Sequence, residues 1–504
     1  MKLCLIVVLV SCTFSNSFAQ KVSRPLIMVH YMPWFQTKVV HGYWGWHWTM
    51  DHYNPDSIDQ SGERSIASHY YPLTGPYDSD DKNILEYQSL LMKIAGIDGA
   101  LVDWYGMDSY FDYGVLNVST QNLFAELQRA QLLFGIVYED QSVKHIVGGG
   151  YITSGNALVY AKGVMNYAQN NWFGQASYIR LNGHPVILTF GPEYFVNSSD
   201  WDTLFSILRT SPLFFTLDNR LSPAASGAFP WPPMWKANAS GILTQDLLNS
   251  YLAQYYAQAP AWPYLVTSAF PGFYDIYKEA GVGPSYGYLD RDSGFTFTST
   301  LQQALVHHPD VIQIATWNDY GEGTIIEPTE EFGNQYLEIV QAARDSLDAA
   351  FQFQKGDLEL PMRIYNARLQ FSGNERVNSA LDRVFNLVIS SQRAAAIQLM
   401  DSLSAAAKVS ENDVDVPAAL ILRQNYPNPF NPSTRIEFSL PAREHIVVRV
   451  YDVLGRAVET LVDGSMSEGM HSVEWAPHSM ESGVYFYRLQ TEGATIVKKL
   501  LYLK

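Results

Sequence analysis

Val311-Ile312-Gln313-Ile314-Ala315, followed by Trp317-Asn318-Asp319-Tyr320-Gly321-Glu322-Gly323-Thr324, is the most informative stretch of the chain. The first part is apolar and β-branched, which predicts a buried strand, and the glycines and aromatics after it predict a shaped loop. Two carboxylates, Asp319 and Glu322, stand three residues apart in this loop. They are either solvated turn residues or a catalytic pair. In such a pair one acid donates a proton to the leaving group and the other acts as base, nucleophile or charge stabiliser, as glycoside hydrolysis requires. A loop so rich in aromatic, glycine and acidic residues directly after a strand favours the second interpretation.

The same pattern of a helical segment and then an apolar run occurs repeatedly upstream. One predicted helix covers Asp81 to Ala95, with Ser79 and Asp80 as N-cap candidates. The predicted strands cover residues 25–31, 99–106, 133–138, 185–190, 212–217, 229–235, 264–269 and 311–315. Eight strands alternating with helices predict an α/β protein with a (β/α)8 barrel, which a helix from Asn334 to Ala350 closes.

Active sites of such barrels are assembled at the C-terminal ends of the strands, where this chain repeatedly has acids and aromatics. We expect convergence there of His30, Tyr31, Asp103, Trp104, Glu139, Glu193, Asp218, Trp317, Asp319 and Glu322. The candidates for substrate contact are Tyr31, Trp34, Tyr71, Asp103, Trp104, Tyr105, Glu139, Glu193, Asp218, Trp317, Asn318 and Tyr320. For each of them the alternative is a rim residue that never touches substrate.

Composition excludes several classes of ligand. The net charge of -17 argues against nucleic acid and fits an uncharged or cationic ligand better. Aromatic residues make up 14% of the chain, which suits stacking on sugar rings. His41, His47 and His52 match no common metal-ligand spacing, so neither a metal nor an organic cofactor is expected.

The N-terminus reads as a secretory signal. Lys2 precedes an apolar run from Leu3 to Val10, and small residues end at Ala19, after which we expect cleavage. A lipoprotein signal that uses Cys12 is the alternative. Cys4 and Cys12 are the only cysteines, so a chain cleaved after Ala19 has no disulfide. No later apolar run reaches the roughly 20 residues that a membrane span needs.

The composition changes after the barrel. Residues 351–415 are rich in helix formers and predict a helical spacer and linker, with an apolar stripe that includes Leu381 and Val384. Residues 416–504 alternate apolar and polar side chains between glycine and proline turns, which predicts a β-sandwich of the Ig-like kind. The expected domains are thus 1–19, 20–350, 351–415 and 416–504.

The last segment resembles the C-terminal sorting domain of the type IX secretion system. The resemblance rests on four motifs: Asn425-Tyr-Pro-Asn-Pro-Phe-Asn-Pro432, Val450-Tyr-Asp-Val-Leu-Gly-Arg456, Ser482-Gly-Val-Tyr-Phe486 and the terminal Lys498-Lys-Leu-Leu-Tyr-Leu-Lys504. It implies type IX secretion machinery as a partner and export to the surface or medium of a Gram-negative bacterium of the Bacteroidota type.

The barrel is similar to glycoside hydrolase families 99 and 71 and their WbsX-like relatives. The matching motifs are residues 70–77, residues 96–106 and the loop at 317–324 with Glu327-Pro328. Family 99 contains endo-acting α-mannosidases and mannanases, and family 71 contains endo-acting α-1,3-glucanases. The resemblance implies that Glu322 is the general acid/base and that Asp319 is the carboxylate that, in family 99, deprotonates the sugar 2-hydroxyl.

The loop departs from family 99, which has Glu, Trp and His where this chain has Asp319, Tyr320 and Gly321. Aspartate reaches about 1.5 Å less far than glutamate, and misplacement on that scale costs on the order of 100-fold in rate. The departure leaves open a general-base role for Asp319 with inversion. The function expected is a secreted endo-acting α-glycoside hydrolase, with a non-catalytic glycan-binding protein and a polysaccharide-biosynthesis protein as alternatives.

Overall fold

The computed structural model describes residues 24–502, apart from 60–61, 413–419, 424, 426–427, 429, 478–479 and 492. The predicted signal, with Cys4 and Cys12, lies outside the described residues. The chain forms two compact units, Met1–Ile397 and Gln398–Lys504. Among the described residues no helix is both long enough and apolar enough to cross a membrane.

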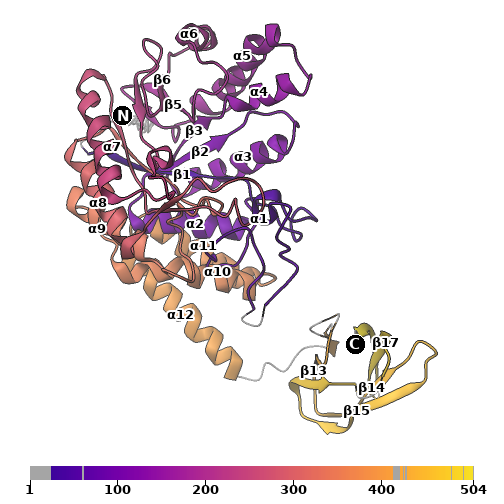
Figure 1. Cartoon of the computed structure of the whole chain (residues 1–504). Helices are drawn as coiled ribbons and strands as arrows, with labels where there is room; N and C mark the ends of the chain where they lie inside the picture. Colours follow the sequence, from indigo (N-terminus) through magenta and orange to yellow (C-terminus); the bar gives the residue numbers. More distant parts are fainter. Residues whose placement is uncertain are drawn as a thin grey trace, which may run out of the picture. The chain divides into compact units, whose positions relative to one another are not determined.

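The first unit is built on eight parallel strands, as predicted (Figure 1). Their order around the sheet is β7-β6-β5-β3-β2-β1-β11-β8, so each strand lies beside its neighbour in the sequence of predicted strands. Each strand is almost entirely buried, which explains why the sequence shows continuous apolar runs rather than alternation. The strands are β1 Leu26–Tyr31, β2 Gly99–Trp104, β3 Leu133–Tyr138, β5 His184–Thr189, β6 Leu213–Leu217, β7 Gly227–Phe229, β8 Val266–Ala269 and β11 Val311–Ile314.

The first and last strands of this order, β7 and β8, lie next to each other. The Tyr255 hydroxyl lies 2.7 Å from the carbonyl oxygen of Ala228 in β7 and 2.8 Å from that of Val266 in β8, and donates to either. The backbone of Gly227 is so close to Tyr264 that a Cβ atom would lie 2.7 Å from its carbonyl oxygen. Tyr255, a residue of helix α7 (Gln245–Gln258), therefore connects the two neighbouring strands that are not paired by backbone hydrogen bonds. The missing strand pairing agrees with the sequence, because the apolar run near residue 229 is the weakest of the eight predicted strands.

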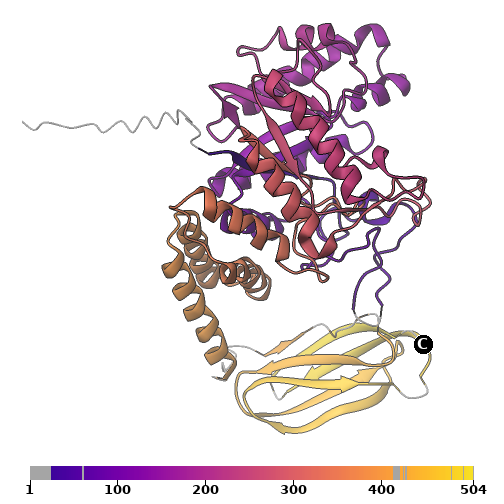
Figure 2. The same ribbon diagram turned by 60° about the vertical axis from the view of Figure 1, so that its left-hand side comes forward.

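Helices surround the strands (Figures 1 and 2). The N-cap of α2 is Asp81, whose side chain accepts a hydrogen bond from the Asn83 N–H; Ser79 and Asp80, the residues predicted for this role, lie just before it. The helices are α1 Trp46–Thr49, α2 Lys82–Ala95, α3 Tyr113–Arg129, α4 Gln141–Gly148, α5 Ala157–Ala168, α6 Ser198–Phe205, α7 Gln245–Gln258, α8 Phe295–Val306 and α9 Gln335–Leu347.

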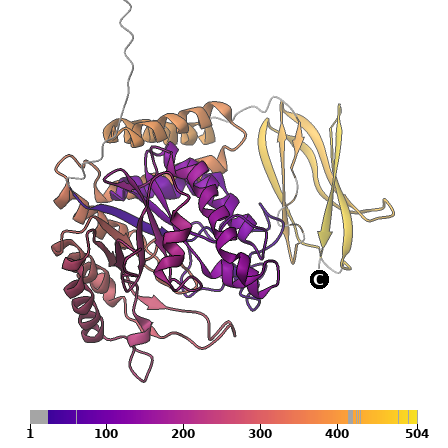
Figure 3. The same ribbon diagram turned by 90° about the horizontal axis from the view of Figure 1, so that it is seen from above.

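Two helices that follow α9 pack against α2, where the orange helices run along the indigo side of the barrel (Figure 3). They are α10 Leu360–Gln370 and α11 Glu375–Ile389, and the longer α12 Arg393–Asn412 follows them. The Arg368 guanidinium donates to both oxygens of the Glu86 carboxylate on α2. Arg129 of α3 lies 3.6 Å from the centre of the Phe385 ring. The contacts join α10 and α11 to the barrel unit.

The second unit contains two antiparallel sheets, in strand order β12-β13-β16 and β15-β14-β17-β18 (Figure 2). Apolar side chains of both sheets form one core, which makes the unit a β-sandwich as predicted. The strands are β12 Ile421–Leu422, β13 Thr434–Leu440, β14 Glu444–Tyr451, β15 Ala457–Met466, β16 Gly469–Trp475, β17 Gly483–Gln490 and β18 Thr495–Tyr502. The sequence pattern missed β15, because this strand has no fully buried side chain and therefore no clear apolar face.

Candidate active site

A cavity of about 1220 Å³ opens at the C-terminal ends of the barrel strands. Residues that follow β1, β2, β3, β5, β7, β8 and β11 line it, so segments from across the first unit meet at one place. Of the predicted site residues, the cavity is lined by Trp34, Asp103, Tyr105, Glu139, Asp319 and Glu322, and His30 joins them.

The loop after β11 holds Asp319 and Glu322 in a defined shape. The Thr316 hydroxyl accepts a hydrogen bond from the Asp319 N–H at 2.9 Å, and Asp319 Oδ1 accepts one from the Glu322 N–H at 3.0 Å. Between the two acids, a Cβ on Gly321 would lie 2.9 Å from the Met50 methyl carbon. A larger side chain at this position would displace the Met50 side chain.

Arg291 fixes the far side of this loop. Its guanidinium donates to the carbonyl oxygens of Gly323 at 2.6 Å and Ile325 at 3.2 Å. The same cation lies over the Tyr70 ring at 4.4 Å and near two further rings. Gly323 has a φ of 64° and comes so close to Tyr274 that a Cβ would lie 2.6 Å from its carbonyl oxygen. The backbone that presents the acids is therefore held from both sides.

Burial disfavours the charged forms of both acids. It raises the pKa of Asp319 to about 6, against the opposing effect of the Glu322 and Gly321 backbone N–H groups. Burial also raises the pKa of Glu322 well above its ordinary range, and the charges of Asp319 and Asp275 add to this effect. The arrangement favours a protonated Glu322 beside an ionised Asp319, which is the state that a general acid with a partner carboxylate needs.

The other half of the loop is turned away from the cavity, into a buried hydrogen-bond network around Glu327. The carboxylate of Glu327 accepts hydrogen bonds from Gln88 at 2.6 Å, Tyr77 at 2.8 Å and Tyr320 at 2.9 Å. Gln88 in turn accepts from the Tyr31 hydroxyl at 2.6 Å. Tyr31 and Tyr320, both predicted to contact substrate, are fully buried here and do not line the cavity.

Asn318 and Trp317 also lie behind the cavity. The Asn318 side chain accepts from the Met32 N–H at 2.8 Å and donates to the Met32 carbonyl at 2.9 Å, which ties the loop after β11 to the loop after β1. It donates further to the Tyr77 hydroxyl at 3.0 Å. Trp317 is fully buried, and its backbone N–H donates to the His30 carbonyl. Both residues shape the loop from outside the cavity lining.

Strand alternation separates neighbours at the end of β2. Asp103 lines the cavity, whereas Trp104 points outward and donates to the Asn117 side chain of α3 at 3.1 Å. Trp104 is fully buried among rings that include Trp172. Successive side chains of a strand face opposite sides, so a cavity-lining position and a packing position follow each other directly.

Three further predicted residues lie outside the cavity lining. The Tyr71 hydroxyl accepts from the Arg64 N–H at 3.1 Å. Glu193 is half exposed and lies 3.8 Å from the Lys144 ammonium. Burial and the nearby charge of Asp218 raise the pKa of Tyr251. Glu193 and Asp218 thus lie apart from the acids that follow β2, β3 and β11.

Aromatic side chains that the sequence analysis did not select complete the cavity. Trp34 stacks on His47 with ring centres 3.9 Å apart, and Tyr105 stacks on Tyr113 at 5.1 Å. Trp231, after β7, contacts His30 edge-on at 4.9 Å, and its hydrogen bond to Glu322 lowers the pKa of that acid. The further aromatic residues of the lining are Tyr43, Trp44, Trp46, Phe111, Phe190, Tyr277 and Tyr286.

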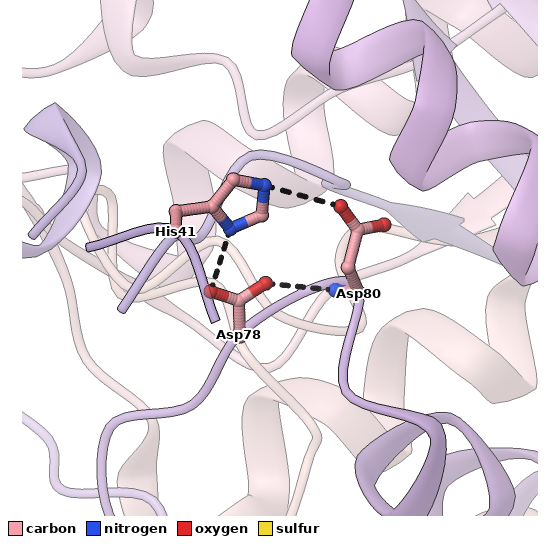
Figure 4. Close-up of side chains that lie close together, drawn as sticks. All are labelled: His41, Asp78 and Asp80. Carbon is pink, nitrogen blue, oxygen red and sulfur yellow. Dashed lines mark hydrogen bonds and ion pairs between the residues drawn. The ribbon is translucent and has the colours of Figure 1, made fainter. Parts of the chain in front are cut away.

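One group of His and acid side chains among the described residues is compact enough for a metal ion: His41, Asp78 and Asp80 (Figure 4). The imidazole nitrogens lie 2.9 Å from Asp78 Oδ2 and 3.3 Å from Asp80 Oδ2. Asp78 also accepts hydrogen bonds from the Thr37 N–H and hydroxyl and from the Asp80 N–H. Protein donors thus occupy these oxygens, and the group ties down the loop that carries Tyr43 and Trp44 to the cavity.

Comparisons with known proteins gave matches for both units of the chain. Residues 424–502 match the family model of the secretion system C-terminal sorting domain, so the chain carries a signal for export to the cell surface or medium. The barrel is similar to the GH99 endo-alpha-mannosidase of Bacteroides thetaiotaomicron, with 19% identity over 64% of this chain and 96% of that one and a TM-score of 0.48. A glycoside hydrolase-like protein matches with 13% identity over 63% and 93% of the two chains and a TM-score of 0.47. No curated protein matches the chain.

Proposed function

We propose that the chain is an exported, endo-acting α-glycoside hydrolase whose catalytic domain covers residues 20–350. The observation that carries the proposal is the pair Asp319 and Glu322, a buried and a partly buried acid three residues apart at the C-terminal end of β11, both facing one aromatic cavity. The sequence resemblance to glycoside hydrolase families 99 and 71 supports α-mannan or α-1,3-glucan as the polymer.

In this proposal Glu322 is the general acid. Its raised pKa keeps a proton available for the glycosidic oxygen, so that the leaving sugar departs as a neutral alcohol. Asp319 is ionised near neutral pH and takes a proton from the nucleophile. The nucleophile is either a water molecule, which gives inversion, or the sugar's own 2-hydroxyl, which gives retention.

Substrate contacts are assigned to the predicted residues that line the cavity. Trp34, stacked on His47, and Tyr105, stacked on Tyr113, offer flat faces to sugar rings. Asp103 and Glu139 offer polar contacts on the wall formed by β2 and β3. A wide cavity with several aromatic faces suits an internal segment of a chain better than a single terminal sugar.

The test is product release from yeast α-mannan, fungal α-1,3-glucan and dextran by the wild type and by Glu322→Gln. The proposal expects oligosaccharides from one polymer and their disappearance in the variant. Turnover that survives Glu322→Gln would refute the assigned site. A polymer that is bound in an affinity gel and never cleaved would support a glycan-binding protein instead.

A further inference from the structure

A second pair of acids stands in the wall of the cavity. Asp103 is in register with Val137 on the neighbouring strand, and Glu139 follows two residues later, so alternation turns both acids into the barrel. Each is 2% exposed, and the two side chains hydrogen-bond to each other. Such a bond requires that one of the two carboxyl groups carries a proton.

The surroundings of this pair leave acceptor capacity unfilled. The Tyr105 side chain hydrogen-bonds to Asp103, and the Gln141 amide donates to Glu139 at 2.7 Å. Asp103 Oδ1 is buried, and no amide, amine or hydroxyl group among the described residues donates to it. Buried polar atoms normally have a partner, and either the proton shared with Glu139 or a donor that arrives with a ligand fills this position.

The cavity also lacks a positive charge to balance its acids. Six carboxyl groups line it: Asp51, Asp103, Asp112, Glu139, Asp319 and Glu322. Among the described residues no Lys or Arg side chain contributes to the lining. Burial lowers the pKa of the lining residues His30 and His47 to about 3, so both are neutral. Adjacent buried acids are stabilised by a shared proton or by a cation, and a cationic ligand in this cavity would supply the cation.

We propose that Asp103 and Glu139 bind the ammonium group of a sugar, so that the substrate class is an α-linked glycan with unacetylated amino sugars. The carboxylates accept the ammonium hydrogens, and the proton shared by the pair leaves as the cation binds. The stacked Tyr105 and Tyr113 rings add an aromatic face beside the charge. As a statement about substrate this rests on the proposed hydrolase function, whereas the binding of an amine does not depend on turnover.

The test compares ligands that differ in one group. Methyl α-D-mannopyranoside and methyl α-D-glucopyranoside are each measured against analogues in which an amino group replaces each hydroxyl in turn. Titration calorimetry with the full chain gives the ratio of affinities. We expect at least one amino analogue to bind about tenfold more tightly than its parent, a difference of about 1.4 kcal/mol.

Variants assign the effect to the pair. Asp103→Asn and, separately, Glu139→Gln bring the affinity ratio close to one. Asp112→Asn is the matched control, since it removes a carboxylate from the same cavity but outside the pair, and it keeps the preference.

Two results would overturn the proposal: no amino analogue that binds more tightly to the wild type, or an equal loss of preference in Asp112→Asn. The wild-type ratio decides even where a variant does not fold. Hydrolysis of neutral polymers without amine preference would refute this inference alone, whereas amine preference without hydrolysis would refute the hydrolase.

Discussion

Glu322 and Glu327 belong to one loop, yet their surroundings differ. Three side-chain donors, from Gln88, Tyr77 and Tyr320, fill the acceptor positions of Glu327. Glu322 faces the cavity, and the indole of Trp231 is the neighbour that hydrogen-bonds to it. Burial raises the pKa of both acids, that of Glu327 to about 7, so a shifted pKa does not separate the two. Unfilled acceptor capacity beside a cavity marks the acid that is free for chemistry.

The largest expected effect is on turnover. Glu322→Gln removes the proton donor and lowers kcat by about 100- to 10,000-fold on the polymer that the wild type cleaves. The unfolding free energy stays close to that of the wild type, because no protein donor loses a strong partner. Reducing-end assays and urea unfolding of the same preparations measure both quantities. If Glu322→Gln lost activity only because it unfolds, Glu322 would have a structural role like that of Glu327, and the proposed difference between the two acids would be wrong.

The converse effect is on stability. Glu327→Ala leaves the Tyr77, Tyr320 and Gln88 donors buried without their acceptor, and we expect the unfolding free energy to fall by about 3 kcal/mol. Urea denaturation monitored by Trp fluorescence gives the value. Glu330→Ala, at an exposed position of the same loop, is the control and changes stability by less than about 0.5 kcal/mol. Equal stability of the two variants would contradict the structural role of Glu327.

The pH dependence distinguishes the two members of the catalytic pair. Asp319 must be ionised, so kcat rises with pH up to its pKa of about 6 and falls about tenfold for each unit below it. Glu322 must be protonated, so activity falls again at a higher pH, above the raised pKa of that acid. Asp319→Asn removes the acidic limb. A profile that kept this limb in Asp319→Asn would assign it to another acid.

The smallest effect concerns the indole beside Glu322. Trp231→Phe removes an N–H that favours the charged carboxylate, so the pKa of Glu322 rises further. We expect the alkaline limb to move up by about 0.5 to 1 unit, since such a hydrogen bond contributes about 1 kcal/mol. The acidic limb, set by Asp319, stays in place. Movement of both limbs together would indicate a general change of the cavity instead.

The fold could be predicted because its signals are local. Seven of the eight barrel strands coincide with predicted apolar runs, β7 ends at residue 229 where the run predicted for it begins, and α2 begins within a residue of its predicted start. The predictions that were wrong concern details that the local sequence pattern does not determine. The N-cap of α2 is Asp81 and not Ser79 or Asp80 as predicted. A shift of one residue along the chain decides which side chain reaches the free N–H groups at the start of a helix.

The site could be predicted only in part. Asp319 and Glu322 share a loop, so their common position beside the cavity followed from the sequence. Tyr31 and Trp104 were chosen because they end strands, but alternation turns them outward and places His30 and Asp103 in the cavity. Side chains along a strand alternate between the two faces. Counting every second residue from one acid that faces the cavity would have separated the inward side chains from their outward neighbours. Trp231 and Tyr113 came from loops whose course depends on packing that no local pattern encodes.

The most direct test of the division of work between Asp319 and Glu322 uses the α-glycosyl fluoride of the sugar that the wild type releases. Fluoride leaves without a proton, so its cleavage needs no general acid. The account predicts that Glu322→Gln cleaves the fluoride at a rate within about tenfold of the wild type, whereas Asp319→Asn stays slow on both fluoride and polymer. Equal loss on both substrates for Glu322→Gln would contradict its role as the proton donor.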